Sequence, residues 1–153
     1  MIARRERAWP IVLLAGVTLA VAMAPPILEP AVRLDVRDHH IAHAIVMAFG
    51  AALGLALAAS APGSGERPAW LVPVIVAPLL AMALMNPASY EFIELRPVLH
   101  ATDHLALAAL AVLTSYGGQR YQRGVGWAAA VFLELMALGA AFGFGVAPPG
   151  AAR

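Results

Sequence analysis

Five histidines in two short windows are the residues of this chain whose types and spacing suit chemistry. The windows are Asp38-His-His-Ile-Ala-His43 and His100-Ala-Thr-Asp-His104. Residues three or four apart lie on the same face of a helix, so His39 and His43 form one pair. His100 and His104 form a second pair by the same rule. Because neutral imidazole is the commonest protein metal ligand, two helices that begin with these windows would offer four imidazoles to one ion.

Three further side chains are candidate ligands beside these pairs. His40 is three residues before His43, and Met47 is one helical turn beyond it. Asp103 can ligate a metal or accept a hydrogen bond that fixes an imidazole tautomer. The predicted metal ligands are therefore His39, His40, His43, His100, His104, Asp103 and Met47.

The donor types narrow the choice of metal. The chain has no cysteine, which excludes thiolate sites, disulfides and cysteine nucleophiles. Imidazole and carboxylate without thiolate favour copper or zinc, with iron as a further option. Thioether is a soft ligand that suits Cu(I). The outer halves of the expected helices contain Met23, Met47, Met82 and Met85, so copper is preferred over zinc.

Composition indicates where these windows must lie. Of the 153 residues, 61% are hydrophobic and 12% are charged, and the mean hydropathy is +0.78. Soluble domains usually contain about a quarter charged residues, so lipid must be the solvent over most of this chain. We therefore expect an all-α protein, a polytopic membrane helix bundle of about five transmembrane helices in one domain that spans residues 1–153.

The expected spans follow from runs of about 20 apolar residues without alternation of period two. They are 10–28, 39–61, 70–87, 98–116 and 125–147. Gly117 and Gly118 are expected to end the fourth span as C-terminal caps. Both histidine windows open a span, the second and the fourth.

Arginine placement predicts the orientation, because positive residues accumulate on the cytoplasmic side. With five spans, one side carries Arg4, Arg5, Arg7, Arg67, Arg120 and Arg123. The N-terminus is then cytoplasmic in a multi-pass protein of the cell inner (plasma) membrane. All five histidines fall near the opposite, extracytoplasmic face. A cleaved signal peptide ending near Ala22-Met-Ala24 is the competing interpretation of the first span, and Pro25 argues against cleavage.

At the histidine windows the sequence resembles the CtaG-like membrane proteins, the cytochrome c oxidase assembly factors linked to copper insertion. The similarity lies in His39-His40-x-x-His43 and in Leu99-His100-Ala-Thr-Asp-His104, and it covers two of the five expected helices. The resemblance implies copper ligands at His40, His43, His100 and His104. It also implies a respiratory complex or a periplasmic copper carrier as partner.

Two other functions stay open at this stage. Paired histidines on facing helices also suit haem b, which would make the protein an electron-transfer subunit. A non-catalytic structural subunit of a membrane complex is the third reading. No nucleotide-binding, zincin or serine-nucleophile motif is present, no catalytic residue is assigned, and nucleic-acid binding is rejected.

Two further features lie within the expected spans. Glu134 lies near the middle of the fifth span, where a carboxylate is costly and is either hydrogen-bonded to a neighbouring helix or part of a proton pathway. Gly50-x-x-x-Gly54 and Gly139-x-x-x-Gly143 permit close helix contact, within the bundle or in a homo-oligomer.

Overall fold

The fold is helical throughout the part of the chain that the computed structural model describes. That part comprises residues 8–24, 36–61, 66–86, 89, 92–93 and 96–144, and it contains no strand. The helices are α2 (Ala8–Ala22), α4 (Val36–Ser60), the short 3-10 helix η1 (Pro68–Trp70), α5 (Leu71–Leu84), α7 (Pro97–Tyr121) and α8 (Arg123–Phe144). The all-α prediction is confirmed.

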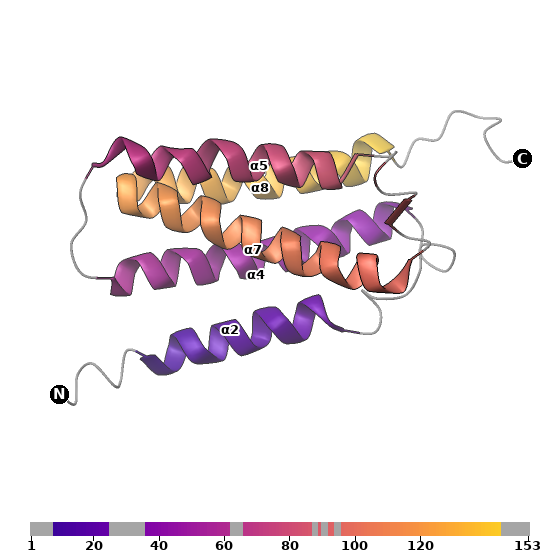
Figure 1. Ribbon diagram of the computed structural model, residues 1–153, viewed down its shortest axis with the longest axis horizontal. Helices are drawn as coiled ribbons and strands as arrows, with labels where there is room; N and C mark the ends of the chain where they lie inside the picture. The colour runs from indigo at the N-terminus through magenta and orange to yellow at the C-terminus, as the bar shows by residue number, and fades with distance from the viewer. Residues whose placement is uncertain are drawn as a thin grey trace, which may run out of the picture.

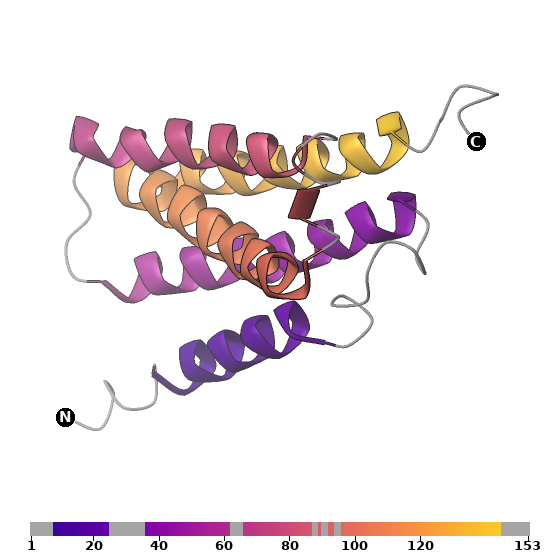
Figure 2. The ribbon, with the colours of Figure 1, turned by 45° about the vertical axis from the view of Figure 1, so that its right-hand side comes forward.

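Four helices form the bundle, and α2 lies on its outside (Figure 1). The most extensive packing is between α4 and α7, and α8 contacts both of them. Helix α5 packs mainly on α7, and α2 packs mainly on α4. The turned view keeps α2 beside α4 and α7, with α5 on the far side of the bundle (Figure 2). The pair α4 and α7 is therefore the centre of the fold.

Three helices are long and apolar enough to cross a membrane. They are Arg37–Ser60, Pro97–Tyr121 and Arg123–Gly143, with 24, 25 and 21 residues. At 1.5 Å per residue, such lengths cover the roughly 30 Å of the hydrocarbon core. The apolar helices Trp9–Ala22 and Pro68–Leu84 are shorter. A membrane protein is thus supported, whereas the expected count of five spans is not established by these helices.

The outer surface of the bundle is apolar, as lipid requires. Large hydrophobic side chains face outward on several helices, among them Val12, Ile75, Leu79, Val131 and Leu135. Hydroxyl groups bond to the backbone within their own helices. Thr18 and Thr114 each donate to the carbonyl oxygen four residues earlier, at 2.8 Å. In an apolar medium this satisfies the hydroxyl without a water molecule.

Glycines set the closest contact, which lies between α4 and α7. A methyl group on Gly50 would lie 2.5 Å from the carbonyl oxygen of Ala108, and one on Gly54 would overlap the carbonyl oxygen of Val112. From Gly50 to Gly54 on α4, the residue contacted on α7 changes from Ala108 to Val112. Both helices therefore advance by four residues in the same direction, so α4 and α7 run parallel. The close packing expected for Gly50 and Gly54 is confirmed, whereas Gly139 and Gly143 meet nothing within 4 Å.

The end of the fourth expected span was wrong. Helix α7 continues through Gly117 and Gly118 to Tyr121, and it ends at Gln122, whose backbone is extended. The two glycines serve packing instead of capping. Gly117 faces the Pro73 ring and the Trp70 carbonyl oxygen, and Gly118 faces the backbone of Gly126. A side chain at either position would push η1 or α8 away from α7.

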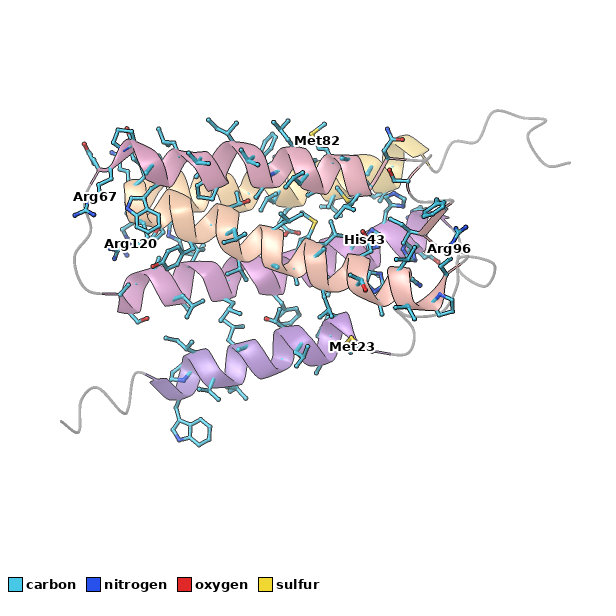
Figure 3. The ribbon with its side chains drawn as sticks, viewed as in Figure 1. Met23, His43, Arg67, Met82, Arg96 and Arg120 are labelled. Carbon is cyan, nitrogen blue, oxygen red and sulfur yellow. The ribbon has the colours of Figure 1, made fainter. Side chains whose placement is uncertain are left out.

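The two ends of the bundle differ in chemistry. Arg67 and Arg120 lie at one end, and His43 and Arg96 lie toward the other (Figure 3). Arg120 donates to the carbonyl oxygen of Ala61 at 3.3 Å and lies over the Trp70 ring. Residues 1–7, 25–35 and 145–153 lie outside the described residues, and with them Arg4, Arg5, Arg7 and parts of the first and fifth expected spans. The membrane side that each end faces stays a prediction.

The two glycine motifs give a matched test of this packing. Gly50→Ala should destabilise the bundle by about 1–3 kcal/mol, because the new methyl meets a backbone oxygen that cannot move alone. Gly143→Ala places the same methyl in open space and should change stability by less than about 0.5 kcal/mol. Unfolding in detergent, followed by circular dichroism, measures both, and equal effects would contradict the contact.

Candidate metal centre

The five histidines occupy the first turns of two parallel helices. His39, His40 and His43 belong to α4, which begins at Val36, and His100 and His104 belong to α7, which begins at Pro97. Proline suits the first turn of a helix because its missing N–H would have no partner there. Each histidine is at most 2% exposed. Both windows therefore point into the bundle, at the same end.

Three of the imidazoles converge from the two helices. The ring centroids of His39 and His43 are 4.3 Å apart, those of His43 and His104 are 4.9 Å apart, and those of His39 and His104 are 5.5 Å apart. One nitrogen from each ring lies within 4.8 Å of the other two. Nitrogens around a tetrahedral ion are about 3.3 Å apart, given bonds of about 2.0 Å. A small rotation of each ring would close this group around a metal ion.

The other two histidines adjoin this trio. His100 lies 4.4 Å from His104 and 5.0 Å from His39, measured between ring centroids. His40 is further out, at 5.7 Å from His43 and 6.2 Å from His39. The expectation that each window forms a one-turn pair agrees with these distances. The tight trio contains His39, whereas the resemblance implied His40.

Asp103 supplies a negative charge to the site across the helix interface. Its Oδ2 atom lies 3.7 Å from Nε2 of His43, and its side chain is buried. Asp103 lies three residues after His100 along α7, but this contact joins it to His43 of α4. A carboxylate beside a metal-ligating imidazole orients the ring and raises its basicity. Asp38, in contrast, is exposed.

Met47 lies in the apolar core that continues from the histidines. It is fully buried and belongs to one cluster with Ala44, Leu107 and Leu133. One helical turn separates it from His43 on α4. The group of close ligand atoms consists of His39, His43 and His104 and does not include Met47.

The electrostatics of the site favour neutral imidazoles, which is the form that binds metal ions. Among the described residues, neither ring nitrogen of His43 has a hydrogen-bond partner, although buried polar atoms nearly always have one. The N-termini of α4 and α7 both meet here and carry partial positive charge, which opposes several imidazolium groups in one place. A metal ion bound to neutral nitrogens would satisfy the lone pairs and would share its charge with Asp103.

The chain matches no protein-family model, no curated protein and no solved structure. The chemistry of this site is therefore inferred from its geometry. That geometry shows a buried group of histidines able to hold a metal ion, and it leaves the identity of the metal open.

Glu134 lines a groove that contains none of the histidines. It is half-buried on α8 and lines a groove of about 390 Å³ with Ala48, Ala51 and Trp127. The expected hydrogen bond to a neighbouring helix is not observed, because Oε1 of Glu134 has no partner within the described part of the chain. The lining is almost wholly apolar, so this carboxyl group faces an environment that resembles lipid.

The contact between Asp103 and His43 predicts a specific effect on metal affinity. Asp103→Asn should weaken binding by roughly 10- to 100-fold, because the neutral amide no longer orients the ring or balances the charge of the ion. Asp38→Asn removes an exposed carboxylate near the same window and should change affinity less than twofold. Competition against a chromophoric chelator measures both constants. Wild-type affinity in the Asp103 variant would refute this role.

Proposed function

We propose that this is an integral membrane protein that binds one copper ion through His39, His43 and His104. The observation that supports the proposal is the convergence of three buried imidazole nitrogens from two helices. Asp103 orients His43 and balances the positive charge. Met47 lies one turn deeper and can complete the donor set when copper is monovalent.

Copper is preferred over zinc for two reasons. First-row divalent ions bind a given nitrogen site most tightly when the ion is copper. A zinc site would not explain why a methionine lies one turn from the histidines. The soft Cu(I) ion, in contrast, accepts a thioether as a ligand. A zinc-loaded protein remains the alternative, because three histidines also suit that ion.

Copper handling is the proposed role, and it requires no catalytic step. By the arginine distribution the histidine end faces outward, so copper would exchange there with a periplasmic carrier or a respiratory complex. The resemblance to the CtaG-like proteins supports assembly of a haem-copper oxidase as the destination. Five spans are part of this proposal, with the shorter apolar helices Trp9–Ala22 and Pro68–Leu84 as the other two.

Haem b is less well supported than a metal ion. A porphyrin must fit between two axial imidazoles, whereas His43 and His104 lie with their centroids only 4.9 Å apart. His39 contacts both of these rings, so the three side chains already fill the space between the helices. A single ion needs no such slot.

Elemental analysis of the detergent-purified protein tests the assignment. After loading with Cu(II), wild-type protein should contain one copper per chain, and His43→Ala combined with His104→Ala should contain none, because two of three ligands are lost and thioethers select the monovalent ion. His40→Gln should retain copper, since His40 lies outside the close trio. Full copper in the double variant would defeat the proposal. A Soret band in the wild-type spectrum would show that the protein binds haem, and the copper assignment would be abandoned.

A further inference from the structure

A second group of soft donors lies beside the histidine centre. Met82 of α5, Met85 at the C-terminal cap of that helix and Met136 of α8 line a groove of about 300 Å³. The other lining residues are Asn86, Gly139 and Ala140. The whole chain has only 6 methionines, and this one groove gathers three of them. This clustering of methionine side chains suggests a role in addition to filling space between the helices.

The methionines continue from the groove into the core. Met85 is 3% exposed and belongs to the same buried cluster as Met47, and Met136 packs against that cluster. Met47 in turn lies one turn from His43 on α4. Met82 and His43 lie toward the same end of the bundle (Figure 3). Thioethers therefore extend from the outer surface to the neighbourhood of the histidines.

The large exposed residues on the outer face of α5 are mostly valine, isoleucine and leucine. Its exposed positions are Val72, Ile75, Val76, Leu79 and Leu80 until Met82, which is 50% exposed. Leucine at position 82 would serve equally well against lipid. The change to methionine occurs only at the end of α5 that lies level with the histidines. This placement distinguishes Met82 from the other large exposed side chains of α5.

The backbone around the groove also favours a cation. Helix α5 ends at Leu84, so its last carbonyl groups lie beside Met85 and Asn86. The C-terminal end of a helix carries partial negative charge, which attracts a positive ion. The histidine centre has the opposite polarity, because it lies at the N-termini of α4 and α7. A cation is therefore drawn first to the groove.

We propose that Met82, Met85 and Met136 form a thioether site that accepts Cu(I) and passes it through Met47 to the histidine centre. The transfer to the histidine centre depends on the proposed copper function, whereas the binding of Cu(I) by the three thioethers does not. Three thioethers with no charged ligand select a soft monovalent ion over Zn²⁺. The ion enters and leaves the groove as Cu(I), so no electron or proton is transferred.

Silver nitrate tests the site directly, since Ag(I) mimics Cu(I) and is stable in air. The full-length protein would carry methyl-¹³C methionine in micelles, with signals assigned from single Met→Leu variants. One equivalent of Ag(I) should shift the signals of Met82, Met85 and Met136, and it should do so in the His43→Ala, His104→Ala protein too. Met23 is 41% exposed on the opposite side of the bundle and should not move. Absent shifts, or an equal shift at Met23, would overturn the site.

A loading experiment tests the connection to the histidines. Met→Leu conserves volume, so the triple variant at 82, 85 and 136 should keep the fold. We expect Cu(I) to load its histidine centre at least tenfold more slowly, to the same final stoichiometry, whereas Met23→Leu loads at the wild-type rate. Wild-type loading in the triple variant would refute the route and leave the copper function intact. Methionine shifts alongside full Cu(II) loading of the histidine double variant would refute that function and leave the thioether site.

Discussion

The rest of this structure depends on one constraint, the direct backbone contact between α4 and α7. Gly50 and Gly54 carry no side chains, so α4 lies directly on the carbonyl oxygens of Ala108 and Val112. The two helices run parallel through this contact, and their N-termini therefore meet at one end. Histidines in the first turns of each helix then face one another without any further device. A wider separation would leave two independent histidine pairs.

Five imidazoles are enclosed at the positive ends of two helices, a place where protonated histidine is unfavourable. Asp103 of α7 offsets part of this positive potential, and its carboxylate lies beside the His43 ring of α4. The polar centre thus joins the helices that the glycines bring together. Its stability and its capacity for metal are two aspects of the same packing.

The bundle separates two kinds of donor by the direction of its helices. Imidazole nitrogens gather where α4 and α7 begin, and thioether sulfurs gather where α5 ends. The apolar cluster around Met47 lies between the two groups. Because α5 runs opposite to α4 and α7, both groups lie toward the same end of the molecule.

The sequence by itself determined the helical class, the one-turn histidine pairs and the packing role of Gly50 and Gly54, because helical periodicity is a local property. It did not show that His39 joins His43 and His104, or that Asp103 contacts His43. Those relations depend on how two helices are rotated and offset against each other, which distant residues decide. The same reason explains why Gly117 and Gly118 pack against η1 and α8 instead of ending α7. It also explains why Met136, unremarkable in the chain, lies beside Met82 and Met85 once α8 is folded against the bundle.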